Sequence, residues 1–539
     1  MKKILIIFLI IFSACTKQEK ADLIVINANI YTVNDNLSKA DAMVVKNGKF
    51  IAVGTSDEIL KKYVAVETLD ADGKTLLPGL IDAHCHFYGL GLAEQKVRLE
   101  GTKSYDEVIQ QLVDFQKEKN LPFITGRGWD QNDWVEKTLP TKEKLDSVFP
   151  DTPVAIRRVD GHALLVNQAA IDLAGVTINT PFSGGDILKK NGKLTGVFID
   201  NPMSLVGSKI PPPTLKEATQ ALKDAEKICF ELGLTTVNDA GLDRSIIELI
   251  DSLQQIGELK LRVYAMVSAS EKNLDYYLNK GISKTDRLNV RSFKVYGDGA
   301  LGSRGAAMRA PYNDKPGHFG ALVNTVDFLQ NTAKRVADSE FQMNTHAIGD
   351  SANHFVLQTY KEVLKDKKDR RWKIEHAQIL SPEDFELFDD IIPSVQPTHA
   401  TSDMYWAQER VGAERIKGGY AYKELLNKYG KVALGTDFPV EKVNPILTFY
   451  AAVARKDLNN YPEGGFQIEN ALTREETLKG MTIWAAFSNF EEHEKGSIEI
   501  GKFADFIILD QNIMEIPLEN IPKTKVTATF VNGEKVNKL

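Results

Sequence analysis

Short apolar segments alternate with longer amphipathic ones through the middle of the chain. Two of the amphipathic segments, residues 214–233 and 325–339, repeat their apolar residues at the period of a helix with one buried face. Eight apolar segments have the length of strands: 79–84, 233–241, 261–268, 291–299, 341–350, 371–378, 391–399 and 431–439. Because strands that alternate with helices form parallel sheets, this pattern predicts an α/β fold with a closed (β/α)8 TIM-type barrel.

The interval after the first predicted strand is too long for a simple connection. It contains two further strand-like segments, residues 122–129 and 152–162, which would raise the barrel above eight strands. We therefore expect residues from about 88 to 213 to form a large insertion after barrel strand 1. The insertion is expected to lie over the mouth of the barrel.

Both ends of the chain carry short strand patterns of their own. Residues 22–79 contain turn dipeptides such as Asn47-Gly48, which are typical of hairpins, and residues 487–539 are similar. Neither end has enough strands to bury a core alone. We expect the two ends to combine into one small β-sandwich domain, with the barrel over residues 80–486.

The N-terminus has the pattern of a signal peptide. Two lysines precede an apolar run over residues 4–12, and small residues follow before Cys15. This arrangement resembles a bacterial lipoprotein signal, in which residues 1–14 are removed, Cys15 is acylated and residues 15–21 form a tether. We expect an exported lipoprotein, anchored to a membrane in the periplasm or cell envelope. Plain secretion and an unprocessed cytoplasmic start are the alternatives.

Composition and charge narrow the class of partner. Of the 539 residues, 43% are hydrophobic and 26% are charged, and the formal net charge is −7. Such a chain can bury a large core, and it has no excess of basic residues to attract a polyanion. We expect a small-molecule substrate and no nucleic-acid partner, and the sequence leaves a homodimer open. With Cys85 and Cys229 the remaining cysteines, no disulfide framework is expected.

Polar residues that can bind metals stand at the ends of several predicted strands. They are His84 and His86 on the first strand, Lys294 on the fourth, His346 on the fifth, His376 on the sixth and Asp437 on the eighth. The C-terminal ends of barrel strands meet at one face, where active sites of this fold lie. A lone His-x-His pair arises by chance, but the whole set predicts one metal centre.

Strand geometry separates the residues around the first two histidines. Residues two apart point to the same side, so His84 and His86 share the barrel interior, whereas Cys85 faces the helical layer as a small buried residue. Nitrogen and oxygen ligands suit zinc, manganese, iron or nickel, and zinc is our first expectation. Lys294 can join such a site only as a carbamate formed with carbon dioxide; alternatively, it pairs with Asp298.

At this point the motifs resemble those of the amidohydrolase superfamily. "PGLIDAHCHF" resembles its first-strand metal motif, and "LGTDFP" contains an aspartate that matches its eighth-strand aspartate. Within the superfamily, "KVYGDGALGSRGA", "NTHAIGD" and "GHFGAL" resemble amidohydrolase family 3, which includes the YtcJ-like proteins and N-substituted formamide deformylase. The resemblance covers nearly the whole chain. It implies one or two divalent ions, with zinc first, held by the six strand-end residues.

The resemblance also implies a reaction, the hydrolysis of carbon–nitrogen bonds other than peptide bonds. A metal-activated water would attack a carbonyl carbon, and Asp437 would accept its proton and return it to the leaving nitrogen. His346 would be a metal ligand that also helps to polarise the carbonyl. The expected substrate is an amide or an N-substituted formamide.

Substrate contacts are expected from the insertion and from loops of the barrel. The residues are Trp129, Asp160 and His162 in the insertion, and Asp298, Arg304 and His318 in the barrel loops. As an alternative, Asp160 and His162 only stabilise their own loop. His354, His399 and His493 are interpreted as structural, and His399 is the best placed of these three to line the pocket.

Other functions remain open at this stage. A deaminase acting on an N-heterocycle would use similar ligands at a mononuclear site without the lysine, so metal stoichiometry separates it from an amidase. A non-catalytic solute-binding lipoprotein would have no use for Asp437 as a proton acceptor. A phosphotriesterase-like or lactonase activity ranks third.

Overall fold

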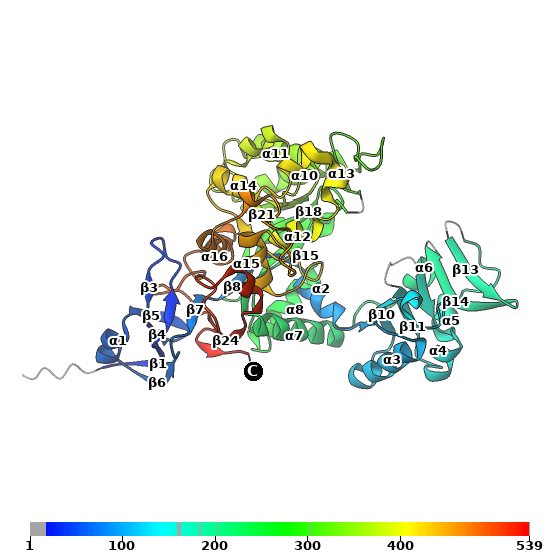
Figure 1. The fold of residues 1–539 in the computed structure, drawn as a ribbon, viewed down its shortest axis with the longest axis horizontal. Helices are drawn as coiled ribbons and strands as arrows, with labels where there is room; N and C mark the ends of the chain where they lie inside the picture. The colour runs from blue at the N-terminus through cyan, green and yellow to red at the C-terminus, as the bar shows by residue number, and fades with distance from the viewer. Residues whose placement is uncertain (1–17, 159–162, 183–184, 201, 303, 538–539) are drawn as a thin grey trace, which may run out of the picture. The chain divides into compact units, whose positions relative to one another are not determined.

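The computed structural model describes residues 18–158, 163–182, 185–200, 202–302 and 304–537 (Figure 1). The chain divides into two compact units. The first combines Met1–Phe87 with Glu226–Leu539, and the second is Tyr88–Ala225. The first unit holds the barrel strands and the strands from both chain ends, and the second contains the predicted insertion, about 88–213, and extends beyond it to Ala225.

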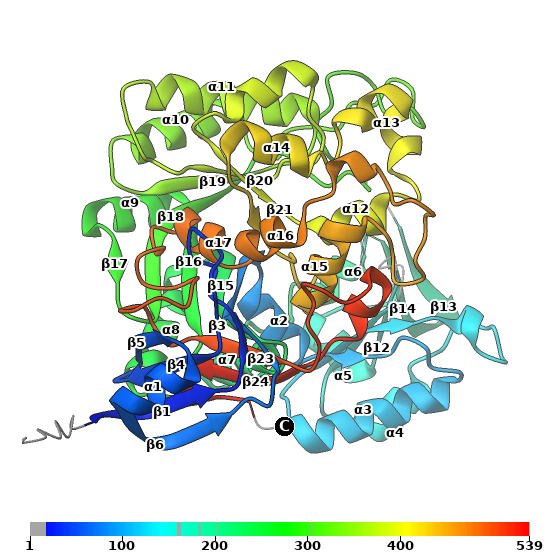
Figure 2. The same cartoon turned by 60° about the vertical axis from the view of Figure 1, so that its left-hand side comes forward.

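The barrel is built from parallel strands in the predicted order, and β15 to β21 are labelled in Figure 2. They are β8 (Leu80–Cys85), β15 (Leu234–Leu242), β16 (Arg262–Ser268), β18 (Leu288–Tyr296), β19 (Gln342–Ala347), β20 (Lys373–His376), β21 (Ile392–Val395) and β22 (Ala433–Leu434). Each pairs with the next, and the short β17 (Ser283–Lys284) joins β18 at the side. The predicted TIM-type fold is confirmed.

Backbone hydrogen bonds close the barrel between its first strand and the segment after its last. The N–H of Asp437 donates to the carbonyl of His84 over 2.8 Å, and the N–H of His86 donates to that of Phe438 over 2.8 Å. This close approach needs a glycine, because a Cβ at Gly435 would lie 2.5 Å from the backbone nitrogen of His84. Closure therefore brings Asp437 directly beside the first-strand histidines.

Helices connect the strands as the amphipathic segments predict. The segment 325–339 forms α10 (Val326–Ala337), whose N-cap Thr325 accepts from the backbone of Phe328. The segment 214–233 forms α7 (Leu215–Glu231). Most of α7 belongs to the second unit, which ends at Ala225. The helices of the first unit also include α8 (Arg244–Gln255), α9 (Glu271–Lys280), α11 (Asp350–Leu364), α12 (Pro397–Asp403), α13 (Ala407–Arg415), α14 (Tyr422–Tyr429), α15 (Pro445–Ala454), α16 (Arg474–Gly480) and α17 (Ile483–Ser488).

Strands from both chain ends share a sheet beside the barrel. The N-terminal β7 (Thr75–Pro78) pairs with the C-terminal β23 (Phe506–Leu509), which pairs with β24 (Val526–Val531). The last two strands are labelled in Figure 2. The second sheet contains β1 (Glu19–Ile26), β4 (Ala42–Lys46), β5 (Lys49–Gly54) and β6 (Tyr63–Asp70). Side chains of both sheets form one apolar core, in which the rings of Phe506 and Phe530 stack 4.3 Å apart.

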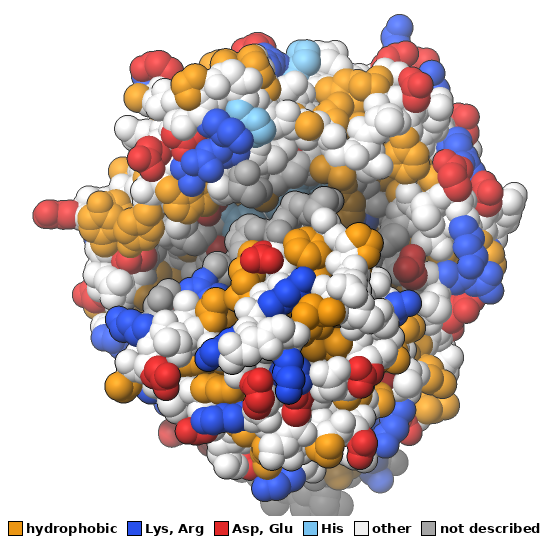
Figure 3. Space-filling view, turned by 90° about the vertical axis from the view of Figure 1, so that its right-hand side faces the viewer, with side chains coloured by type: hydrophobic (Ala, Val, Ile, Leu, Met, Phe, Trp, Pro, Cys, Tyr) orange, Lys and Arg blue, Asp and Glu red, His pale blue; other side chains and the backbone are white. Residues whose placement is uncertain are grey.

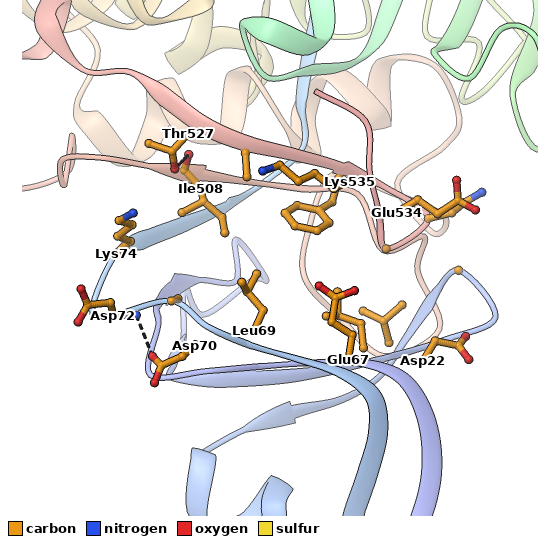
Figure 4. Close-up of a pocket in the computed structure, with 18 of the residues that line it drawn as sticks. Asp22, Glu67, Leu69, Asp70, Asp72, Lys74, Ile508, Thr527, Glu534 and Lys535 are labelled. Carbon is orange, nitrogen blue, oxygen red and sulfur yellow. Dashed lines mark hydrogen bonds between the residues drawn. The ribbon is translucent and has the colours of Figure 1, made fainter. Parts of the chain in front are cut away.

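A cavity of 940 Å³ opens between these two sheets (Figure 4). Apolar side chains such as Leu69 and Ile508 line it, together with the carboxylates of Glu67, Asp70 and Asp72. None of the residues predicted for the metal centre belongs to its lining. This cavity is thus separate from the strand-end residues of the barrel.

The second unit has a sheet of its own. Its strands are ordered β13 (Gly185–Lys190), β14 (Lys193–Asp200), β12 (Ala163–Val166), β11 (Val154–Arg158), β10 (Ile124–Trp129) and β9 (Val97–Arg98). Helices α3 (Tyr105–Lys119), α4 (Glu143–Val148) and α5 (Gln168–Ala174) belong to the same unit. The strand-like segments of the insertion thus form β10 and β11, outside the barrel. That the insertion covers the barrel mouth stays a prediction.

The surface and the helices add two observations. On the face drawn in Figure 3, lysines and arginines are interspersed with aspartates and glutamates. Among the described residues, every helix is too short or too polar to cross a bilayer. The predicted signal segment and Cys15 lie outside the described residues.

Candidate metal centre

The strand-end residues of the barrel converge on one buried cluster. One ligand atom each from His84, His376 and Asp437 lies within 4.8 Å of the others, and all three residues are buried. His376 is the last residue of β20, and Asp437 follows the end of β22 by a short segment. Ligand atoms from the ends of three separate barrel strands therefore surround a common point.

The other predicted ligands adjoin these three. Oδ1 of Asp437 lies 3.2 Å from Nε2 of His86 and 3.6 Å from Nε2 of His84. Nζ of Lys294 lies 3.3 Å from the same nitrogen of His84. The ring of His376 is 4.7 Å from that of His84 and 4.6 Å from that of His346. All six residues are thus neighbours.

Cys85 lies outside the cluster, as the alternation of strand residues predicts. Its side chain is buried, and Sγ is 3.5 Å from the carbonyl oxygen of Asn238 on the neighbouring strand. Burial is the main cause that raises the pKa of this thiol. A protonated, buried thiol on the outer side of β8 is a packing residue.

Two polar side chains orient His84 and His376 through the ring nitrogens that point away from the cluster. Nδ1 of His84 donates to Oε2 of Glu375 over 2.6 Å, and Nδ1 of His376 donates to Oε1 of Gln396 over 2.7 Å. Such partners fix the ring orientation and direct Nε2 toward the cluster, where it can bind a metal. The sequence interpretation missed both residues. For Glu375 the available signal was a carboxylate within a strand that the barrel fold predicts to be buried.

Backbone strain turns the side chains at the ends of two strands. His376 has φ 78°, Ala377 has φ 43° and Asp437 has φ 62°, all in the left-handed region that non-glycine residues rarely adopt. Neighbouring residues of a regular strand point to opposite sides. The turn at His376 allows both Glu375 and His376 to reach the ring of His84.

Burial and neighbouring charges set the protonation of the cluster. Burial lowers the pKa of His346 to about 3, with Lys294 adding to the effect, and it lowers the pKa of Lys294 to about 8. Burial alone would raise the pKa of Asp437, but His86, His84 and His399 outweigh it and lower the pKa below its usual value. At neutral pH the cluster thus combines a neutral His346 imidazole with an ionised Asp437 carboxylate.

Unpaired polar atoms show that these residues fit a divalent cation. Among the described residues, Oδ1 of Asp437 and Nε2 of His346 are buried without a well-formed hydrogen bond. Buried polar atoms are normally hydrogen-bonded, so two such atoms in one cluster fit a site that binds a cation. Imidazole nitrogens and a carboxylate are the donors that zinc, manganese, iron and nickel accept.

The predicted substrate residues of the barrel loops lie in two places. Asp298 is buried next to His346, at 3.5 Å, and accepts from the backbone N–H groups of Ala307, Ile348 and Gly349. Burial raises its pKa to about 7, although these bonds oppose the shift. Among the ion pairs of the described residues there is none between Lys294 and Asp298, and Nζ of Lys294 lies 3.3 Å from Nε2 of His84.

Arg304 and His318 make their contacts within a single loop. The guanidinium of Arg304 donates to Asp314 over 2.7 and 3.1 Å, and Nε2 of His318 lies 2.9 Å from the carbonyl oxygen of Arg304. These contacts support the loop between them. Their roles in binding substrate stay predictions.

In the insertion, Trp129 is a core residue. Its side chain has no exposed surface, and its indole N–H donates to the carbonyl of Ile156 over 3.0 Å. The ring packs against Trp134, at 6.2 Å. This placement gives Trp129 a packing role in the unit, and a contact with substrate stays a prediction. Asp160 and His162 lie outside the described residues.

Comparison with known proteins gives a consistent family. Residues 67–537 match the model described as "Amidohydrolase family". Protein LONG AFTER FAR-RED 3 of Arabidopsis thaliana is 32% identical over 96% of this chain and 91% of its own length. N-substituted formamide deformylase of Arthrobacter pascens is 25% identical over 95% of this chain and 97% of its own.

A further curated relative and a solved structure extend the likeness to nearly the whole chain. Putative amidohydrolase YtcJ of Bacillus subtilis (strain 168) is 29% identical over 94% of this chain and 98% of its own length. An uncharacterized metal-dependent hydrolase from Pyrococcus furiosus has a TM-score of 0.78 and 28% identity. That similarity covers 92% of this chain and 100% of the other.

Proposed function

Because this chain belongs to the amidohydrolase family, we propose that its metal centre hydrolyses the carbon–nitrogen bond of an amide or an N-substituted formamide. The chain is a metal-dependent hydrolase of the amidohydrolase superfamily. One observation carries the finer proposal: an ionised, buried Asp437 lies among imidazoles, with Oδ1 3.2 Å from His86 and 3.6 Å from His84 but without a well-formed hydrogen bond. A carboxylate in this setting can accept a proton from water.

The six clustered residues would hold one or two divalent ions, and zinc is the proposed metal. The ligands would be His84, His86, Lys294, His346, His376 and Asp437. When bound, the ion would make water acidic enough to supply the nucleophile and would polarise the substrate carbonyl. Lys294 would join as a carbamate: its neutral amine adds to the carbon of carbon dioxide, forms an N–C bond and releases one proton.

The protein residues divide the proton transfers between them. Asp437 accepts the proton of the attacking water at a carboxylate oxygen and later gives it to the leaving nitrogen, so that an amine departs neutral. His346, whose low pKa keeps it neutral, would bind the metal without adding a positive charge to the site. Glu375 and Gln396 hold the rings of His84 and His376 in place.

The amide or formamide specificity draws support from one relative. N-substituted formamide deformylase of Arthrobacter pascens aligns over nearly the whole chain, although at 25% identity. The test is a panel of N-formyl amines, N-acyl amino acids and cyclic amides with the zinc-reconstituted protein. Release of an amine without ammonia is expected. Release of ammonia from N-heterocycles would favour a deaminase, and silence across the panel would favour the solute-binding alternative.

We propose in addition that the chain is exported and anchored by a lipid on Cys15. The pattern of basic, apolar and small residues before Cys15 supports this placement. Expression in a bacterium fed a labelled fatty acid should give a labelled, membrane-associated protein. The Cys15→Ser variant should be unlabelled and lose its membrane association. A labelled Cys15→Ser protein would contradict the anchor.

A further inference from the structure

His399 lies against the outer oxygen of Asp437. Its Nε2 is 3.5 Å from Oδ2 of Asp437, whereas Oδ1 faces His84 and His86. The His399 side chain is 12% exposed. The two oxygens of the proposed proton acceptor therefore have different surroundings: one faces the proposed metal ligands, and the other faces a histidine outside that set.

The position of His399 follows from the way β21 continues into a helix. Helix α12 (Pro397–Asp403) starts just after the strand, with a proline in its first turn, and places His399 at the C-terminal end of the barrel. The backbone N–H of His399 donates to the carbonyl of Gln396 over 3.0 Å. Its ring stacks on that of His376 at 5.9 Å with 25° between the planes.

The far end of α12 is anchored on two sides. Asp403 accepts from the hydroxyl of Tyr420 over 2.8 Å and from the amide of Gln378 over 2.7 Å. The hydroxyl of Ser402 donates to Glu441 over 2.6 Å, which ties the helix to the segment that follows Asp437. Helix and aspartate are thus held relative to each other, as a precise functional site requires.

We propose that His399 is a positioning residue for Asp437, an inference that rests on the proposed hydrolytic function. Nε2–H of His399 donates to Oδ2 and fixes the plane of the carboxylate. Oδ1 then stays directed toward His84, His86 and the attacking water. A carboxylate free to rotate would present the accepting oxygen for only part of the time, and misplacement of catalytic groups is costly. Hydrogen bonds of this kind tighten when substrate binds.

Two substitutions and a matched control test this role in the zinc-loaded full chain. His399→Ala removes the donor, and His399→Gln keeps an N–H group on a side chain of similar reach. His354 provides the control, because its Nδ1 lies 2.7 Å from Asp384 in another histidine–aspartate pair. His354→Ala should leave kcat near the wild-type value.

The expected results separate positioning from the alternatives. For His399→Ala we expect kcat to fall about 10- to 100-fold, with zinc per chain unchanged and KM nearly unchanged. His399→Gln should recover much of the loss. An unchanged kcat would overturn the proposal. Loss of zinc would make His399 a ligand instead, and a change confined to KM would make it a substrate contact.

A structural readout keeps this test separate from that of the proposed function. Crystal structures of the zinc-loaded variants should show the Asp437 carboxylate rotated in His399→Ala and in its original plane in His399→Gln. If the wild-type protein were inactive on the whole amide panel, the proposed function would fail. The orientation of the Asp437 carboxylate in the variant structures would still test the positioning role of His399. An unrotated Asp437 in His399→Ala would overturn the positioning role.

Discussion

Two buried lysines of the barrel, Lys294 and Lys373, differ in their partners more than in their burial. Both are almost fully buried, and burial lowers the pKa of each to about 8. Lys373, at the start of β20, donates to the side-chain oxygen of Asn489 over 2.9 Å. Lys294, toward the end of β18, has the imidazole of His84 at 3.3 Å. Burial therefore does not distinguish the proposed metal ligand from the other buried lysine, whereas the neighbouring side chain does.

The two ends of the barrel differ in the same way. At the start of β16, Arg262 is completely buried and donates to both oxygens of Asp505 over 2.6 and 2.9 Å. At the opposite end, Asp437 and His346 each have a buried atom without a well-formed hydrogen bond. The Arg262–Asp505 pair is fully hydrogen-bonded and stabilises the fold, whereas Oδ1 of Asp437 and Nε2 of His346 are available to a ligand. Changes at the two ends should therefore alter different properties.

The largest effect is expected at the C-terminal end. Asp437→Asn removes the proton acceptor but keeps an oxygen of similar shape, so turnover should fall by about 10²- to 10⁴-fold while zinc stays bound. Steady-state kinetics and metal analysis of the same sample measure both. Asp505→Asn is the matched change at the other end and should keep its turnover per folded molecule. A near-normal rate in Asp437→Asn would contradict the assignment.

The next largest effect is expected at Arg262. Arg262→Ala leaves Asp505 buried and unpaired, which should lower the free energy of unfolding by about 3–5 kcal/mol without changing zinc per folded chain. Urea unfolding provides the measurement. Lys260→Ala, at an exposed pair with Glu534, should cost no more than about 1 kcal/mol. Equal losses in the two variants would remove the distinction.

The same pair has a predicted pH dependence. Burial would raise the pKa of Asp505, but Arg262 outweighs it and holds the pKa below 3.8. A lowered carboxyl pKa stabilises the fold fully above its unfolded value, and the contribution is lost as pH falls further. The urea concentration at half-unfolding should therefore fall as the pH is lowered below about 4, and it should fall more steeply for the wild type than for Arg262→Ala.

The two lysines give a direct test of the comparison. Lys294→Met should weaken zinc binding at least about 10-fold, because it removes a proposed ligand. Lys373→Met changes a lysine of equal burial and should leave zinc binding close to wild type. Zinc titration followed by calorimetry measures both. Equal affinities in the two variants would mean that Lys294 is only a second buried lysine.

The smallest effect is expected at Glu375, which bonds to a proposed metal ligand and does not itself bind the metal. Glu375→Gln keeps a hydrogen-bond acceptor for Nδ1 of His84 but removes the negative charge. Metal affinity should fall about 10-fold, with the fold intact. The comparison variant is Glu383→Gln, whose carboxylate pairs with Arg309 away from the cluster. A loss in Glu383→Gln equal to that in Glu375→Gln would assign the effect to general charge.

The sequence predicts the barrel and the ring of strand-end residues because both follow from periodicity. Alternation along β8 separates His84 and His86 from Cys85 without knowledge of any other strand. Glu375 was missed, and His399 was singled out only as the best placed of three histidines to line the pocket. Their contacts with His84 and Asp437 depend on backbone turned at His376 and on a helix that begins directly after β21. Trp129 shows the opposite limit: a motif residue whose burial depends on the packing of its own sheet.

The central claim is that the clustered strand-end residues form a metal centre, and anomalous diffraction at the zinc edge tests it most directly. Crystals of the full chain grown with zinc should give an anomalous peak about 2.0–2.2 Å from Nε2 of His84, Nε2 of His376 and a carboxylate oxygen of Asp437. The peak should vanish in a variant with both histidines replaced by alanine. Absence of a peak at this point in wild-type protein that hydrolyses its substrate would contradict the account.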